Sequence, residues 1–178
     1  MKTAILDRDG VINYDSKAFI KSPDEWVAIP GSLEAIAKLK QAGWRVIIAT
    51  NQSGLARGLF NMDTLNAIHL KMRQQLAAFG AHVDAIFICP HGPDDHCTCR
   101  KPLPGMFIEA MRRYDLNPED CVAVGDSLRD LQAAHAAQIS TALVLTGNGA
   151  QTQQQPLPPF TTTHPDLAAV VQFWLAQS

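Results

Sequence analysis

Five short apolar runs alternate with longer amphipathic segments along this chain, and that alternation is what most restricts its fold. The runs predict strands over Thr3–Leu6, Arg45–Thr50, Ala85–Cys89, Cys121–Gly125 and Thr141–Leu145. The other segments predict helices over Ser32–Gln41, Met62–Phe79, Pro104–Tyr114, Leu128–Ala137 and Asp166–Ala176. Strands that alternate with helices form βαβ units, so we expect an α/β fold with a central parallel sheet.

The chain has 178 residues, and we expect residues 1–178 to form a single domain with a sizeable core. Ser32 is the expected N-cap of the first helix. The polar, proline-rich segment Gln151–Pro159 is expected to be a surface connection. The last helix is expected to pack on the core through an apolar stripe at helical spacing, made by Leu167, Val170, Val171 and Trp174.

Charge and hydropathy exclude several classes of partner. The chain carries 15 basic and 17 acidic residues, a net charge of −2, which argues against nucleic acid or a polybasic membrane surface as the partner. No apolar run approaches the roughly 20 residues needed to span a bilayer, and the first residues do not resemble a signal peptide. We therefore expect a cytoplasmic protein. Nothing in the sequence specifies a partner surface, so we expect a monomer.

Two carboxylates follow the first predicted strand, in the tetrapeptide Asp7-Arg8-Asp9-Gly10. In open α/β sheets, chemistry collects at the carboxyl ends of the strands. Side chains alternate faces within a strand, so Asp7 and Asp9 converge only if the backbone bends just after Asp7. A converged pair can divide the work: one carboxylate attacks, the other moves protons, and Mg²⁺ holds the substrate between them. Taken alone, the same residues also describe an acidic turn after a strand.

The second predicted strand ends in Thr50-Asn51-Gln52-Ser53-Gly54. Thr50 can offer its hydroxyl and backbone N–H to a phosphate oxygen, although such a segment is also an ordinary loop. Arg100 and Lys101 precede a predicted helix. Lys101 is a compact cation that can balance carboxylates and a phosphoryl group, and Arg100 offers a planar fork to phosphate or sugar oxygens.

The fourth predicted strand ends in Gly125-Asp126-Ser127, with Asp130 one helical turn further on. A carboxylate at a second strand end is what Mg²⁺ needs to complete an oxygen shell with Asp7. Asp126 is the expected ligand. Asp130 either supports Asp126 or occupies the first turn of the helix, where a negative charge is favoured.

Three cysteines and a histidine form a second constellation, Cys89-Pro90-His91 and Cys97-Thr98-Cys99. Cytosolic cysteines rarely form disulfides, and three thiols with an imidazole can supply a closed tetrahedral zinc site of the Cys₃His type. The closed site leaves no position for a substrate, so we interpret it as structural.

A zinc ion would hold Gly92–His96, a loop with almost nothing hydrophobic to hold it, and so place Arg100 and Lys101. The alternatives are a Cys97–Cys99 redox pair or unpaired thiols. His96 competes with the preferred His91 as the fourth ligand, and Cys121 is expected to be an inert core residue.

In order along the chain, the segments at the strand ends resemble the four motifs of the haloacid dehalogenase superfamily: DxD, a strand-end Thr or Ser, a Lys, and GDxxxD. The resemblance covers residues 3 to about 147. It implies that Asp7 is the nucleophile and forms an aspartyl-phosphate. It also implies that Asp9 is general acid to the leaving group and then base to water. Asp9 favours phosphoryl transfer over dehalogenation, which does not use that second aspartate.

With the cysteine motif included, DRDGVIN, TNQSGLARG, CPH…CxCRKP and GDSxxD closely resemble the D-glycero-D-manno-heptose-1,7-bisphosphate 7-phosphatase family. The resemblance implies a Rossmann-like three-layer sandwich with a zinc-stabilised loop and no separate cap domain. It implies an Mg²⁺-dependent phosphoric monoester hydrolase that removes the C7 phosphate of a small phosphorylated sugar. The pathway it implies is nucleotide-activated heptose biosynthesis, for lipopolysaccharide or another glycan.

The family pattern also implies roles at matching positions. Thr50 and Lys101 would stabilise the transferring phosphoryl group, and Arg100 would recognise the far end of the substrate. Mg²⁺ would lie on Asp7, Asp126 and the backbone carbonyl of Asp9. The sugar site would be lined by Asp15, Ser16, Lys17, Ala18, Asn51, Gln52 and Ser53.

The chain departs from the family at Ser127, also expected at the substrate, where many members carry Lys. Loss of that cation weakens the expected grip on the substrate, and the loop between the zinc-ligand pairs is shorter than in some members. The enzyme alternatives that these motifs leave open are histidinol-phosphate phosphatase, a near relative, and another small sugar-phosphate phosphatase. A non-catalytic, zinc-stabilised interaction module is the alternative of a different class. His69 and His135 are expected to be structural or solvent-facing.

Overall fold

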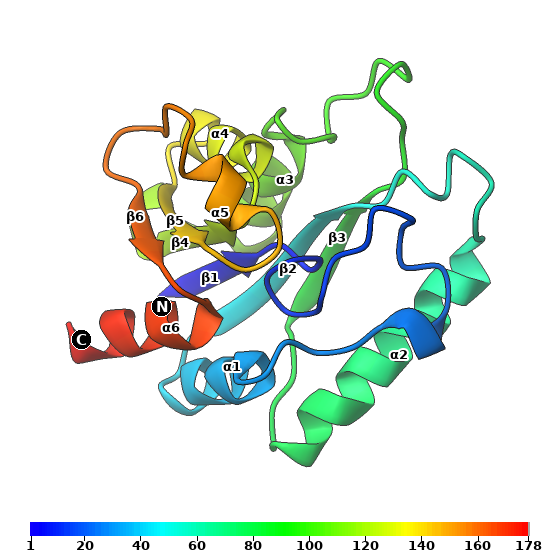
Figure 1. Cartoon of the computed structure of the whole chain (residues 1–178). Helices are drawn as coiled ribbons and strands as arrows, with labels where there is room; N and C mark the ends of the chain where they lie inside the picture. The colour runs from blue at the N-terminus through cyan, green and yellow to red at the C-terminus, as the bar shows by residue number, and fades with distance from the viewer. Residues whose placement is uncertain (178) are drawn as a thin grey trace.

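A six-stranded parallel sheet forms the centre of the computed structural model, which describes residues 1–177 (Figure 1). Its strand order is β3-β2-β1-β4-β5-β6, and every neighbouring pair is parallel. The strands are β1 (Thr3–Leu6), β2 (Arg45–Asn51), β3 (Ala85–Cys89), β4 (Cys121–Gly125), β5 (Ser140–Val144) and β6 (Thr162–His164).

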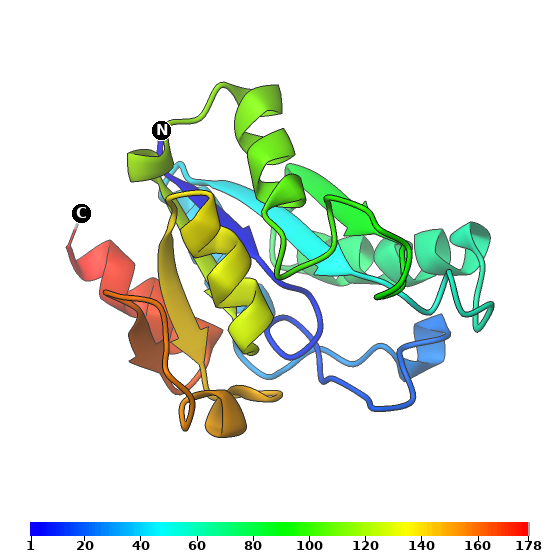
Figure 2. The same ribbon diagram turned by 90° about the horizontal axis from the view of Figure 1, so that it is seen from above.

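Helices cover both faces of the sheet, which gives three layers (Figures 1 and 2). The α-helices are α1 (Ser32–Gln41), α2 (Met62–Ala78), α3 (Gly105–Tyr114), α4 (Leu128–Ala136), α5 (Gly149–Thr152) and α6 (Leu167–Ala176). Two short 3₁₀ helices span Pro23–Glu25 and Pro118–Asp120. Helices α1, α2 and α6 pack on one face, and α3 and α4 on the other. None of the helices in the described part of the chain is long and apolar enough to cross a membrane.

The core has two halves because β1 and β2 are buried on both faces, as expected for strands of a parallel sheet. Leu6 and Ile48 pack with α1, α2 and α6, whereas Ile5 and Ile47 pack with α3 and α4. The predicted apolar stripe of α6 is confirmed as buried. Trp174 in this stripe stacks on Trp44, with ring centroids 5.5 Å apart.

The direction in which the chain adds strands to the sheet reverses between β1 and β4. From β1 the chain adds β2 and β3 on one side, and β4, β5 and β6 then extend the sheet on the other. Such a reversal opens a crevice at the carboxyl ends of the two central strands, where ligands of open α/β sheets bind. The residues directly after β1 and β4, Asp7 and Asp126, therefore lie beside this crevice.

The predicted fold class, the five strands and the five long helices are confirmed, with boundaries that differ by at most one residue. Strand β6 was not predicted, because three residues of a half-exposed edge strand, Thr162–His164, carry no apolar alternation. The segment Gln151–Pro159 is not entirely irregular, because its first two residues belong to the short helix α5.

The prediction that Ser32 caps α1 was wrong. Gly31, with φ of +86°, is the N-cap, and Ser32 is the first helical residue. The Ser32 side chain is buried, and its hydroxyl donates to the Val11 backbone carbonyl over 2.8 Å. The hydroxyl thus satisfies a carbonyl of the loop after β1 and not the first turn of its own helix.

Candidate active site

The backbone turns directly after β1 and brings two carboxylates to one cavity. The Asp7 backbone N–H still donates to Val124, over 3.0 Å, so Asp7 continues the line of the strand. The turn follows at Gly10, whose φ of +83° is unfavourable for any other residue and whose Cα leaves no room for a Cβ beside Asp126. Asp7 and Asp9 both line a cavity of about 290 Å³.

A buried lysine lies between two aspartates at the base of this cavity. Lys101 Nζ is 3.1 Å from Asp7 Oδ1 and 2.8 Å from Asp130 Oδ1, and the Lys101 side chain is 2% exposed. Burial alone would lower the pKa of this ammonium, but the charges of Asp130 and Asp7 outweigh it and raise the pKa above its ordinary value. Lys101 is therefore a permanently charged cation beside Asp7.

The end of β2 holds the lysine in place through its backbone. Asn51 Oδ1 accepts from the Lys101 N–H over 3.1 Å, and Asn51 Nδ2 donates to the Lys101 carbonyl over 3.2 Å. The Asn51 amide is thus engaged by the protein itself, although the residue lines the cavity as expected. Gln52 Nε2 donates to Thr50 Oγ1 over 2.9 Å and to Asp9 Oδ2 over 3.2 Å.

Asp126 enters the cavity from the end of β4 and meets a residue from the loop after β5. The Asn148 backbone N–H and side-chain amide donate to Asp126 Oδ2 over 2.8 and 3.2 Å. Burial and the neighbouring charges of Asp130 and Asp7 raise the pKa of Asp126 to about 8. Burial and the Asp130 charge likewise raise the pKa of Asp7 to about 7, against the opposing pull of Lys101.

Three carboxylates that lie close together beside Lys101 fit a divalent metal ion. Oxygens of Asp7, Asp126 and Asp130 all lie within 4.8 Å of one another. Asp130 uses Oδ1 for Lys101 and Oδ2 for the Ser127 N–H and hydroxyl, which leaves it little capacity as a ligand. Among the described residues, Asp7 Oδ2 and Asp126 Oδ1 accept no hydrogen bond. Asp7 and Asp126 are therefore the side chains that fit Mg²⁺, which takes few carboxylates.

The crowding of these carboxylates predicts that Asp126→Asn stabilises the protein in magnesium-free buffer. The folded-state pKa of about 8 lies above the usual value near 4, so the stability of the unmodified protein falls as pH rises between those values. We expect the variant to gain about 1–3 kcal/mol in the free energy of unfolding at pH 8 and much less at pH 5. Urea unfolding at both pH values measures the gain. An equal effect at both, or a loss at pH 8, would contradict the prediction.

The surroundings of Asp9 differ from those of Asp7. Burial raises the pKa of Asp9, but the Arg8 charge and hydrogen bonds from Arg8, Asn13 and Gln52 together bring it below the ordinary value. Arg8 Nε and Asn13 Nδ2 both donate to Asp9 Oδ1, over 2.8 and 2.9 Å. The two carboxylates of the DxD sequence thus have different surroundings. Asp7 faces the Lys101 ammonium and other carboxylates, whereas Asp9 is held by hydrogen-bond donors.

Most of the predicted site residues meet at this cavity. Besides the aspartates and Lys101, its lining includes Asp15, Ser16, Lys17, Asn51, Gln52, Ser53, Arg100 and Ser127. Ala18 and Thr50 are not part of the lining; Thr50 is 1% exposed and its hydroxyl accepts from Gln52. Residues that the sequence analysis did not single out also line the cavity: Phe19, Ile20, Arg57, Arg129 and Asn148. Of these, Asn148 could have been found, because it follows β5 at the same edge of the sheet.

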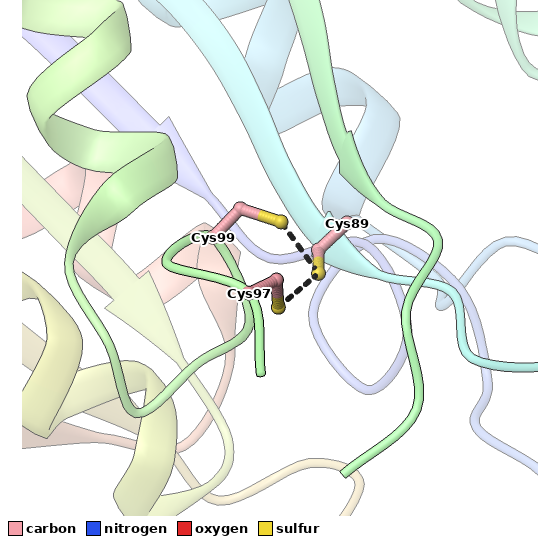
Figure 3. A group of neighbouring side chains, drawn as sticks. All are labelled: Cys89, Cys97 and Cys99. Carbon is pink, nitrogen blue, oxygen red and sulfur yellow. Dashed lines mark hydrogen bonds between the residues drawn. The ribbon is translucent and has the colours of Figure 1, made fainter. Parts of the chain in front are cut away.

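The three clustered cysteines converge at the end of β3 (Figure 3). Cys89 Sγ lies 2.8 Å from Cys99 Sγ and 3.8 Å from Cys97 Sγ, and the three thiols are free. Two sulfurs bound to one tetrahedral zinc ion lie about 3.8 Å apart, which is the separation of Cys89 and Cys97; Cys99 lies closer to Cys89 and would move outward to bind the ion. Neither His91 nor His96 belongs to this group of mutually close ligand atoms. The structure thus brings the thiols together without the predicted imidazole.

Hydrogen bonds to the sulfurs also connect the cluster to the cavity. Burial raises the pKa of Cys97, but the Arg100 N–H and other hydrogen bonds lower it below its ordinary value, which favours the thiolate that binds metals. Arg100 Nη1 also donates to the His91 carbonyl over 3.2 Å. The loop that carries the thiols therefore positions Arg100, and Lys101 follows directly.

Comparison with known proteins agrees with this arrangement. Residues 1–138 match the family model of the haloacid dehalogenase-like hydrolases. D-glycero-beta-D-manno-heptose-1,7-bisphosphate 7-phosphatase from Bordetella bronchiseptica is 62% identical over 100% of both chains. The enzyme of that name from Pseudomonas aeruginosa is 52% identical over 93% of each. The crystal structure of the B. bronchiseptica phosphatase, complexed with magnesium and phosphate, has a TM-score of 0.98 over the full length of both chains.

Three features define a haloacid dehalogenase-like hydrolase: the parallel sheet, the DxD turn after β1 whose first aspartate contacts a lysine, and the aspartate at the end of a second strand. The described part of the chain has no separate cap domain. The expected family resemblance is confirmed. At this level of identity over its full length, the chain belongs to the D-glycero-D-manno-heptose-1,7-bisphosphate 7-phosphatase family.

Proposed function

We propose that this protein removes the C7 phosphate of D-glycero-D-manno-heptose 1,7-bisphosphate in an Mg²⁺-dependent hydrolysis. The observation that carries the proposal is the contact of Lys101 Nζ with Asp7 Oδ1, 3.1 Å, in a cavity whose other oxygens suit a divalent metal. Asp7 and Asp126, with the Asp9 backbone carbonyl, would hold the ion. When bound, Mg²⁺ neutralises phosphoryl charge and orients the group for in-line displacement.

In the proposed sequence of steps, Asp7 attacks the phosphorus atom and Lys101 balances the charge on the transferring group. The C7–O–P bond breaks on the phosphorus side, and Asp9 gives its proton to the departing sugar oxygen. The anionic phosphoryl group raises the proton affinity of Asp9, which makes its carboxyl group available as an acid. Asp9 then takes a proton from water, which attacks the aspartyl-phosphate and releases inorganic phosphate.

The second phosphate of the substrate needs a cation away from Asp7, and three arginines in the cavity lining can supply one. Arg100 is the proposed partner because its side chain is already oriented by the His91 carbonyl, over 3.2 Å. Arg57 and Arg129 are the other two. Asp15 and Ser16 follow β1 and also line the cavity, where they can meet sugar hydroxyls. We keep Thr50 and Ala18 as proposed site residues.

Phosphate release with Mg²⁺ tests the proposal on both anomers of heptose 1,7-bisphosphate, with histidinol phosphate assayed alongside. We expect the heptose bisphosphate to be hydrolysed with the highest kcat/KM and one anomer to be preferred. Preference for histidinol phosphate would keep the chemistry and overturn the substrate. Absence of metal-dependent release from all three would overturn the proposed enzyme function and favour a non-catalytic module.

We also propose that Cys89, Cys97 and Cys99 bind a structural zinc ion, with His91 as the fourth ligand after a small rearrangement of its loop. We expect about one zinc ion per chain in the purified protein and strong loss of zinc in Cys99→Ser. Because the loop positions Arg100 and Lys101, this variant should lose both thermal stability and kcat/KM. Metal analysis by mass spectrometry and a melting curve measure the two effects.

The matched control for the zinc prediction is Cys121→Ala. Cys121 is 1% exposed, begins β4 and lies outside the thiol cluster, so this variant should lose some stability and keep its zinc. Equal zinc content in Cys99→Ser and Cys121→Ala would contradict the zinc site. Zinc retained in His91→Ala together with zinc lost in His96→Ala would identify His96 as the fourth ligand.

The monomeric state and cytoplasmic location remain predictions.

A further inference from the structure

We infer that His69 is a positioning residue of this site: it holds the Arg8 guanidinium, and Arg8 in turn fixes the Asp9 carboxylate toward the cavity. The inference rests on the proposed phosphatase function. It adds to the reaction a residue from the middle of α2, a helix that supplies no lining residue to the cavity.

Three side chains connect the middle of α2 with the cavity. Arg8 Nη1 lies 3.1 Å from His69 Nε2, and Arg8 Nε donates to Asp9 Oδ1 over 2.8 Å. The Arg8 side chain is 0% exposed and His69 is 6% exposed, whereas the Asp9 carboxylate is 21% exposed and lines the cavity. The connection therefore leads from the protein interior to the proposed acid.

The contact between Arg8 and His69 has only one chemically consistent form. A guanidinium has donors and no acceptor, so His69 Nε2 must accept, and the ring must be the neutral tautomer protonated at Nδ1. Burial and the charges of Arg8 and Arg73 lower the pKa of His69 to about 4, in agreement with a neutral ring. His69 is thus a fixed acceptor for Arg8 at neutral pH.

A role in packing alone does not explain why a guanidinium is buried here. Arg8 Nη2 is buried and has no hydrogen-bond partner among the described residues. A buried unsatisfied donor destabilises the folded protein, and an apolar side chain at this position would avoid that cost. The arrangement that the pair maintains is the orientation of Asp9, whose other oxygen is held by Gln52 Nε2 over 3.2 Å.

Both ends of this connection are anchored. Ile68 and Met72 flank His69 on α2 and are 0% exposed in the core, so the helix cannot shift easily. On the other side, the Arg8 carbonyl accepts from the backbone N–H groups of Ile12 and Asn13, over 2.8 and 3.3 Å. Removal of the imidazole acceptor should therefore release the guanidinium without moving either backbone.

The test compares His69→Leu, which removes the acceptor, with His69→Gln, whose amide oxygen can accept from Arg8. Met72→Leu is the matched control, because it alters a buried apolar residue of the same helix and leaves the imidazole acceptor in place. The magnesium-loaded enzymes are assayed by rapid quench on heptose bisphosphate and on p-nitrophenyl phosphate. The aryl leaving group needs little protonation, so only the sugar substrate depends strongly on a correctly placed Asp9.

We expect His69→Leu to slow release of the sugar about 10- to 100-fold with KM changed less than about 3-fold. Release of p-nitrophenol should fall less than about 3-fold, and His69→Gln should regain most of the lost rate on the sugar substrate. Met72→Leu should keep both rates. Equal losses on the two substrates, unchanged rates in His69→Leu, or no rescue by His69→Gln would overturn the positioning role.

A crystal structure of His69→Leu separates this inference from the proposed function. We expect the contact between Arg8 Nε and Asp9 Oδ1 to be lost or displaced. An intact contact in this variant would overturn the inference, whether or not the unmodified protein is active. If the unmodified protein hydrolysed neither substrate, that result alone would overturn only the proposed function.

Discussion

Asp7→Asn is expected to abolish turnover while the fold remains intact. The neutral amide cannot attack phosphorus, so kcat should fall by about 10⁴-fold or more. The amide oxygen can still accept from Lys101 Nζ, which lies 3.1 Å from Asp7 Oδ1. Removal of one negative charge from the crowded cluster also relieves repulsion, so the melting temperature in magnesium-free buffer should not decrease. Phosphate release and a melting curve on mass-verified protein measure both effects.

The control for this variant is Asp120→Asn. Asp120 is exposed and directly precedes β4, so it lies at the edge of the sheet opposite to Asp7. It should keep full kcat and nearly full stability. Full activity in Asp7→Asn, with its mass confirmed, would remove Asp7 as the nucleophile. A large loss of activity in both variants would show that the assay reports folding and not chemistry.

Lys101→Met is expected to have the second-largest effect, and it should affect stability as well as catalysis. The substitution removes the cation that contacts both Asp7 and Asp130, so kcat/KM should fall by about 10²–10³-fold. It leaves the carboxylates of Asp7 and Asp130 without their cation, and removal of one member of a buried ion pair costs about 3–5 kcal/mol. Urea unfolding and initial rates measure the two losses.

A double substitution separates the two roles of Lys101. In Lys101→Met/Asp130→Asn the buried charge that faces the lost ammonium is also removed, so most of the stability should return. Activity should not return, because Asp7 still lacks its cation. Lys38→Met, which alters an exposed lysine of α1, is the control and should change neither quantity measurably. Recovery of activity in the double variant would contradict the proposed role of Lys101 at the phosphoryl group.

The motif residues show which parts of the site can be predicted from local sequence. Asp7 and Asp126 could be recognised because each follows an apolar run, and parallel strands end at one edge of a sheet. Arg100 and Lys101 could be placed near that edge because they follow the cysteine motif. Asn51 was expected at the sugar, but its amide holds both backbone groups of Lys101. That contact joins two loops with no pattern between them.

The fourth zinc ligand, in contrast, could not be predicted from local sequence. The pattern C-x-H followed by C-x-C indicates four ligands, and three of them, Cys89, Cys97 and Cys99, lie together. Whether His91 or His96 completes the set depends on the path of five intervening residues, Gly92–His96. That path is decided by the metal and by loop geometry, because the segment has almost no apolar side chains that could anchor it to the core.

The amino-acid sequence by itself determined the succession of strands and helices and the acidic residues that follow β1 and β4. It could do so because periodicity, apolar runs and turn residues are local properties. Only the tertiary structure decided which distant groups meet: Lys101 with Asp130, Asn148 with Asp126, and Arg8 with His69. Arg8 and His69 are 61 positions apart. Their contact arises from the packing of α2 against the sheet, and such packing depends on the whole core.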